Sequence, residues 1–129
     1  MLKRIDHIGV IVDNLEEAQA FLTGMGMEFD RALEFPGRLK AAFYRCGEIQ
    51  VEVIEITDGA EREARLRGEK ARIEHIAIEV DELASTLAAL QGLGVRANSP
   101  EPVRIGANLN VWTTEESCDG VSYQLIEKG

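Results

Sequence analysis

The 129-residue sequence lacks several features that mark specialised classes of protein. It has no apolar run of membrane-spanning length, and the apolar stretch at residues 8–12 is too short for a secretory signal. Its two cysteines, Cys46 and Cys118, lie outside any CxxC or zinc-ribbon spacing, so we interpret them as reduced thiols. These absences predict a cytoplasmic protein that does not associate with a membrane.

Positive charge and aromatic rings are also scarce. Lys and Arg total 14 against 23 Asp and Glu, which gives a net charge of −9 and no basic stripe of the kind that binds nucleic acid. Aromatic residues make up only 5% of the chain, so few rings are present to stack on a large planar ligand. The length and the 45% hydrophobic content indicate one globular domain.

The chain contains an internal repeat with a constant offset of 68 residues. Self-similarity on this scale indicates that the fold is built from two copies of one unit. The recurring residues are Ile5 and Ile73, His7 and His75, Ile8 and Ile76, Val12 and Val80, Asp13 and Asp81, Leu15 and Leu83, Ala20 and Ala88, Leu22 and Leu90, Gly24 and Gly92, and Gly26 and Gly94.

Each copy predicts one strand, one helix and three further strands. The opening strand is continuous and β-branched, residues of N-cap type follow it, and we expect Gly24 and Gly92 to end the helices in a left-handed conformation. The later strands are predicted at 27–35, 39–46 and 49–56, and at 95–103, 108–113 and 121–127.

These elements predict an α+β fold with two tandem βαβββ modules forming a curved mixed sheet around a metal-binding cavity. Module one spans about residues 1–57 and module two about 73–129. The linker at 58–72 is polar, highly charged and without a strand pattern, and both an irregular and a partly helical conformation fit it.

The only two histidines, His7 and His75, occupy the same place in the two copies. Chance placement would do this roughly once in a hundred cases, which is informative within a repeat. A pseudo-twofold arrangement of the modules would bring equivalent positions together, which favours metal binding. The alternative is a core histidine that both copies retained.

A second correspondence, with an offset of 72 residues, relates Glu52 to Gln124 and Glu55 to Glu127. The change of offset predicts about four extra residues in the second module, in a hairpin turn. A carboxylate inside an apolar strand is costly unless it is paired or binds a metal. Period-two alternation places Glu52 inward, and we expect Glu55 and Glu127 to face solvent.

Two imidazoles, one carboxylate and one amide oxygen form a donor set that suits one divalent transition metal, such as Zn, Ni, Co, Mn or Fe. Structural zinc would more often use sulfur. Four protein ligands leave coordination positions for water or substrate, so the set His7, Glu52, His75 and Gln124 indicates chemistry rather than structure.

At these residues the sequence resembles the vicinal oxygen chelate superfamily, which includes glyoxalase I, methylmalonyl-CoA epimerase, ring-cleaving dioxygenases and antibiotic-resistance proteins. The resemblance covers nearly the whole chain. The family pattern, a metal ligand on the first and last strand of each module, falls on His7, Glu52, His75 and Gln124. The opening strands look most like the epimerase branch, and the short length also resembles bacterial glyoxalase I. Family resemblance implies a homodimer.

The resemblance implies a metal-dependent isomerase or lyase acting on a small anionic thioester or thiohemiacetal. In both activities a proton leaves the carbon next to a carbonyl, and the metal holds the resulting enolate or enediolate. Glu52 is the expected base, because Gln124 cannot accept the proton. Glu34 matches only approximately the second base of the epimerases.

Two alternatives come from other branches of the family. A metal-free small-molecule binding or resistance protein would generally lack the full ligand set, which this chain retains. An Fe(II) ring-cleaving dioxygenase, like a fosfomycin-type transferase, would carry a glutamate where Gln124 lies.

Seven further residues are candidates for substrate binding. The basic ones would hold a distant phosphate or carboxylate, with a solvated surface role as the alternative. The asparagines lie in a strand-like segment, where asparagine is disfavoured, and either orient substrate or mark an edge strand. The aromatic ones line a pocket or pack in the core. The seven are Arg38, Lys40, Arg104, Asn108, Asn110, Phe43 and Trp112.

Overall fold

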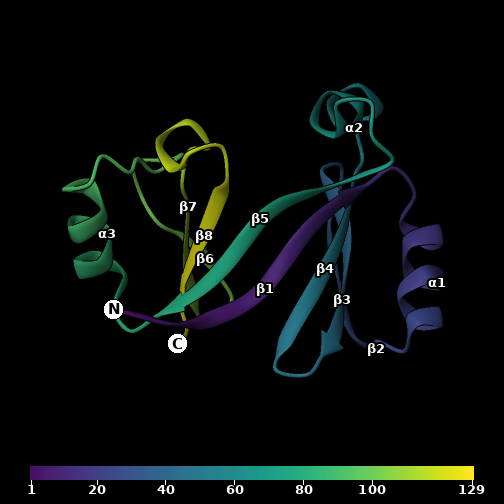
Figure 1. Cartoon of the computed structure of the whole chain (residues 1–129), viewed down its shortest axis with the longest axis horizontal. Helices are drawn as coiled ribbons and strands as arrows, with labels where there is room; N and C mark the ends of the chain where they lie inside the picture. Colours follow the sequence, from purple (N-terminus) through teal and green to yellow (C-terminus); the bar gives the residue numbers. More distant parts are fainter. The chain divides into compact units, whose positions relative to one another are not determined.

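The two copies of the repeat both fold in the order strand, helix, strand, strand, strand, and the computed structural model describes all 129 residues (Figure 1). The hydrogen-bonded strand order is β2-β3-β4-β1-β5-β8-β7-β6, with parallel and antiparallel neighbours, which confirms the α+β class and the mixed sheet. The elements are β1 (Leu2–Val12), α1 (Leu15–Met25), β2 (Glu28–Phe35), β3 (Leu39–Cys46), β4 (Ile49–Ile56), α2 (Gly59–Leu66), β5 (Ala71–Val80), α3 (Leu83–Gln91), β6 (Val103–Ile105), β7 (Asn108–Trp112), the 3₁₀ turn η1 (Glu116–Cys118) and β8 (Ser122–Glu127).

The chain forms two compact units, and the strands β1 and β5 each contribute to both. The His7 unit comprises residues 7–74, and the His75 unit comprises residues 1–6 and 75–129. In the His7 unit Asp13 N donates to Lys70 O, and in the His75 unit Asp81 N donates to Met1 O. None of the helices is long and apolar enough to span a membrane.

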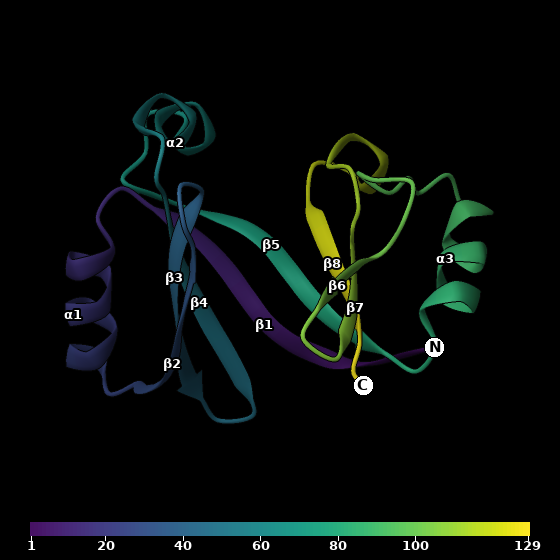
Figure 2. The same cartoon turned by 180° about the vertical axis from the view of Figure 1, so that it is seen from behind.

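In the His7 unit the sheet has two chemically different faces. Period-two alternation sends Val12, Ala42, Tyr44 and Val53 to one face, where they pack with Leu22. Leu22 belongs to α1, which lies beside the strands β2, β3 and β4 (Figures 1 and 2). The residues between them project from the other face. Helix α1 therefore covers one face only, and the opposite face carries His7 and Glu52.

The His75 unit repeats this arrangement. Val80, Val111 and Leu125 project from one face of β5, β7 and β8 and pack with Leu83 of α3. The alternate residues, which include His75 and Gln124, project from the other face.

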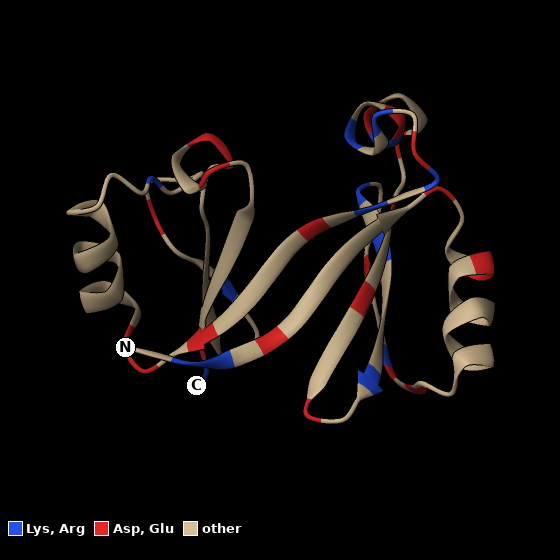
Figure 3. Ribbon diagram, viewed as in Figure 1, with Lys and Arg blue, Asp and Glu red and all other residues tan.

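The linker forms a helix, α2, which carries charges of both signs (Figure 3). Only Leu66 of this helix is buried, and it packs with Ile11 and Ile56 in a small apolar cluster. A single apolar contact position in a charged segment is a weak signal, which explains why the sequence left an irregular conformation open.

Two carboxylates that we expected to face solvent instead accept hydrogen bonds from the first residues of helices. Glu55 Oε1 accepts a hydrogen bond from Leu15 N at 2.9 Å, and Glu127 Oε1 accepts one from Leu83 N at 2.7 Å. The prediction was wrong because an α-helix begins with unpaired N–H groups and a positive dipole end, and both attract a carboxylate.

The predicted strand at 95–103 is also wrong. Only Val103–Ile105 forms a strand, and Ala97 makes a single bridge to Thr113. Pro100 and Pro102 lie in this segment, and proline has no N–H to donate to a strand ladder.

The helix ends differ from the prediction as well. Gly24 lies inside α1, and Gly26 is the left-handed C-cap, with φ of 105°. Gly92 is the C-cap of α3 but is right-handed. Gly26 and its repeat partner Gly94, with φ of 88°, are therefore the glycines after these two helices whose left-handed backbone favours glycine.

The extra residues of the second module lie mostly between β7 and β8. Twelve positions separate the paired residues Trp112 and Gln124, against nine between Phe43 and Glu52 in the first module. Three of the four extra residues are thus in this connection, which contains η1.

We predict that replacing Glu127 by Ala lowers the free energy of unfolding by about 1–2 kcal/mol, because no side chain caps α3 from its own N-cap position. Replacing Glu55 by Ala should cost less, because Asn14 also caps α1. Urea denaturation measures both, with the exposed Glu48→Ala as control. Equal losses in all three variants would contradict the capping role of Glu127.

Candidate metal centre

His7 and Glu52 are brought together by the parallel pairing of β1 and β4. The register pairs His7 with Gln50 and Gly9 with Glu52, so the two side chains lie two residues apart on the same face. His7 Nε2 lies 3.3 Å from Glu52 Oε1. Both residues are buried, with exposed fractions of 4% and 7%.

This geometry fits two ligands of one cation. Two N or O donors about 2.1 Å from the same ion, separated by a right or tetrahedral angle, would lie roughly 3.0–3.4 Å apart. The His7–Glu52 separation of 3.3 Å falls in that range. A buried carboxylate also needs a partner charge, which a cation supplies.

His75 and Gln124 occupy the same positions in the other unit. The parallel register of β5 and β8 pairs His75 with Ser122 and Ala77 with Gln124, matching the register in the His7 unit step for step. Both residues are buried, with exposed fractions of 4% and 7%. The repeat therefore preserves the relation between histidine and oxygen donor.

The amide of Gln124 has a defined orientation, and Asn110 sets it. Asn110 Nδ2 donates to the backbone oxygen of Val103 at 3.3 Å, so Asn110 Oδ1 must face the other way. That oxygen accepts a hydrogen bond from Gln124 Nε2 at 2.9 Å. The Gln124 carbonyl oxygen, which is the atom able to bind a cation, is consequently turned away from Asn110.

The chain thus carries a His–Glu–His set of buried groups able to bind a metal ion, together with the amide of Gln124. Imidazole and oxygen donors without thiolate suit a divalent transition metal.

The predicted aromatic residues lie beside the ligand candidates. Phe43 pairs with Glu52, and Trp112 pairs with Gln124, so each module places one ring next to its oxygen donor. The Phe43 ring also packs edge-on against the His7 ring, with 5.3 Å between centroids.

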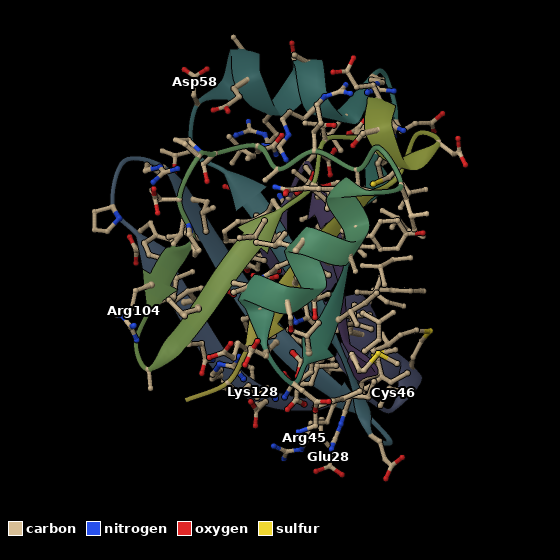
Figure 4. The ribbon with its side chains drawn as sticks, turned by 90° about the vertical axis from the view of Figure 1, so that its left-hand side faces the viewer. Glu28, Arg45, Cys46, Asp58, Arg104 and Lys128 are labelled. Atoms are coloured by element: carbon tan, nitrogen blue, oxygen red, sulfur yellow. The ribbon has the colours of Figure 1, made fainter.

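The predicted basic residues do not lie with the ligand candidates. Lys40 pairs with Glu55 on the face covered by α1, and Arg38 is exposed in the β2–β3 turn. Arg104 pairs with Leu109, which packs against the apolar residues that contact α3. The side chain of Arg104 extends to solvent (Figure 4). Asn108 accepts a hydrogen bond from Gly129 N, and the side-chain hydrogen bond of Gln124 goes to Asn110 instead.

Glu34, the approximate match to a second base, is also on the wrong face. It pairs with Lys40, so it projects on the α1 side of the sheet rather than on the Glu52 side.

A cluster of charged side chains around Asp30 was not predicted from the sequence. Asp30 lies at a β-bulge and contacts Arg31, Arg45 and Gln50. Hydrogen bonds from Arg31 and then from Gln50 hold the pKa of the Asp30 carboxyl below its ordinary value. Strict alternation along β2 would send Asp30 and Arg31 to opposite faces, and only the bulge brings them together.

Two βαβββ modules with a histidine on the first strand and an oxygen donor on the last define the vicinal oxygen chelate class of protein. Residues 6–112 match the family model of the Glyoxalase/Bleomycin resistance protein/Dioxygenase superfamily, and the chain belongs to this superfamily. The resemblance found in the sequence is thereby confirmed.

Two of the individual proteins that resemble this chain are methylmalonyl-CoA epimerases. The human mitochondrial methylmalonyl-CoA epimerase is 26% identical over 133 residues, covering 96% of this chain and 73% of that protein. The methylmalonyl-CoA epimerase of Mycobacterium tuberculosis has a similar structure, with a TM-score of 0.86, 19% identity and coverage of 99% and 89%. A hypothetical protein of Bacillus halodurans has a TM-score of 0.85, 23% identity and coverage of 98% and 94%.

We predict that Asn110→Leu weakens binding of a divalent metal by roughly 10- to 100-fold, because Gln124 loses the partner that orients its amide. Isothermal titration with Zn²⁺ or Co²⁺ measures the affinity. Asn108→Ala is the matched control, since it alters the same strand and leaves the Gln124–Asn110 hydrogen bond in place. Unchanged affinity in a folded Asn110→Leu protein would contradict the orienting role.

Proposed function

We propose that this chain is a metal-dependent isomerase that moves a proton at the carbon next to the carbonyl of a small acyl-CoA thioester, as a methylmalonyl-CoA epimerase does. The family membership and the epimerase relatives support this activity. The observation that carries the proposal is the His7–Glu52 contact, with the same strand register repeated around His75 and Gln124.

In this proposal His7, Glu52, His75 and Gln124 hold one divalent metal ion. Such an ion supplies stabilisation of the negative charge that develops on a carbonyl oxygen when the adjacent C–H proton leaves. The chemistry of the four donors supports the assignment, because it combines imidazole nitrogen with carboxylate and amide oxygen and contains no thiolate.

Glu52 moves the proton. It is the only carboxylate among the four donors, and Gln124 has no group that accepts a proton at neutral pH. A carboxylate has two oxygens, so it is able to hold a position in the donor set with one and exchange a proton with the other. The position of Glu34 on the α1 side gives no support for a second base there.

A CoA thioester is the substrate class that the relatives favour. A Streptomyces coelicolor methylmalonyl-CoA epimerase, 22% identical with a TM-score of 0.86, has been solved in complex with 2-nitronate-propionyl-CoA. Another methylmalonyl-CoA epimerase structure of the same similarity contains methylmalonyl-CoA.

Elemental analysis of the purified protein, before and after chelation and reloading, tests the metal. We expect about one divalent transition metal per chain, and loss of this metal in both His7→Ala and His75→Ala, because each removes a donor. Cys46→Ser is the control, since it removes an exposed thiol, a group of a type that is able to bind metals, without removing a proposed donor. A reloaded protein without metal would overturn the proposal and favour a metal-free binding protein.

Replacing Glu52 by Gln separates proton transfer from metal binding. The variant keeps an oxygen donor, as Gln124 does in the other unit, so we expect metal content to be retained. Exchange of the proton next to the thioester carbonyl, followed by NMR in D₂O with methylmalonyl-CoA, should slow by about 10²–10⁴-fold. Full exchange in the variant would exclude Glu52 as the base. If the wild-type protein converted a thiohemiacetal but did not exchange the proton of methylmalonyl-CoA, the activity would be that of a glyoxalase-like lyase instead.

A further inference from the structure

A row of paired residues crosses the His7 unit on the face that carries Glu52. Arg31 on β2 pairs with Phe43 on β3, and Phe43 pairs with Glu52 on β4. Directly paired residues project from the same face of a sheet. The row therefore connects an arginine on the outermost strand of this unit to the carboxylate of the candidate centre.

Phe43 is the physical link in this row. Its side chain is buried, and its ring makes an edge-to-face contact with the ring of His7. The guanidinium carbon of Arg31 lies 3.9 Å from the centroid of the Phe43 ring. A guanidinium stacked on an aromatic face is attracted to the ring and keeps its N–H groups in plane for hydrogen bonding. Arg31 and His7, a candidate metal ligand, thus contact the same phenyl ring.

One nitrogen of the guanidinium fixes its position. Arg31 Nη1 donates to Asp30 Oδ2 at 2.7 Å and to Gln50 Oε1 at 3.3 Å. These are the only hydrogen bonds that the guanidinium makes within the chain. The N–H groups of Nε and Nη2 are therefore available to donate hydrogen bonds to a ligand. The side chain is 54% exposed, so a solute reaches them from solvent.

Arg45 contacts the same carboxylate but differs from Arg31. Besides Asp30, it lies 3.6 Å from Glu28, and these labelled side chains lie next to each other in Figure 4. Two carboxylates therefore offset the charge of Arg45, and no aromatic ring connects it to His7. Arg31 shares a single carboxylate and points along the row.

We propose that Arg31 binds a carboxylate on the acyl group of the substrate and selects malonyl-type acyl thioesters over uncharged ones. The fork of Nε–H and Nη2–H matches the two oxygens of a carboxylate. Because Arg31 stacks on the ring that also contacts His7, its guanidinium suits a second charged group on the same small acyl unit, whereas the phosphates of coenzyme A lie many bonds from the thioester. This inference rests on the proposed thioester activity.

Equilibrium binding with two probes tests the selection without requiring turnover. Malonyl-CoA carries the acyl carboxylate and propionyl-CoA does not, while their coenzyme A portions are identical. We expect Arg31→Gln to weaken malonyl-CoA binding by roughly 10- to 100-fold and to leave propionyl-CoA binding unchanged. Arg45→Gln, a change of the same charge in the same cluster, should preserve the wild-type preference.

Arg31→Lys should retain part of the preference, because it keeps the charge and loses the planar fork. Equal weakening of both probes by Arg31→Gln, or no weakening of either, would overturn the inference. So would a wild-type protein that does not prefer malonyl-CoA. Failure of the proposed isomerase appears differently, as absence of metal or of proton exchange in a protein that still discriminates between the probes.

Discussion

The arrangement of each module depends on the parallel pairing of its first and last strands. That pairing fixes which residue of β4 lies beside His7 and which residue of β8 lies beside His75. A slip of one residue would turn Glu52 or Gln124 to the helix-covered face and break the apolar packing on that face at the same time. The register of the first and last strands of a module therefore determines both the packing of its core and the position of its donors.

The polar residues buried near the donors are satisfied by hydrogen bonds, and apolar residues such as Ile11 and Ile56 are buried on the same face. Asn110 is 3% exposed, yet its amide is satisfied by Val103 O on one side and Gln124 on the other. No buried side-chain nitrogen or oxygen lacks a hydrogen-bond partner. Such a network favours one orientation of each amide, since reversing any of them would place two donors or two acceptors against each other.

The sequence was most informative where the repeat applied. The offset of 68 residues predicted both opening strands and the equivalence of the histidines, and the later offset located Glu52 and Gln124 on paired strands. It was least informative where local chemistry overrode the pattern. Pro100 and Pro102 removed a predicted strand, a bulge brought Asp30 and Arg31 together, and two expected surface glutamates proved to cap helices. The three causes are missing N–H groups at two prolines, a shift of register at a bulge, and helix ends distant in the sequence, none of which periodicity detects.

The last strand of each module carries two polar residues, close together in the sequence, that project from opposite faces of the sheet. This arrangement limits how the sequence can diverge. Glu52 and Glu55 lie three positions apart on β4, one beside His7 and the other at the start of α1, as Gln124 and Glu127 do on β8. An insertion between the members of either pair would disconnect a donor from its face or a helix from its cap. Length variation among descendants of this chain is thus restricted to the connections between strands, and the second copy has already diverged in this way between β7 and β8.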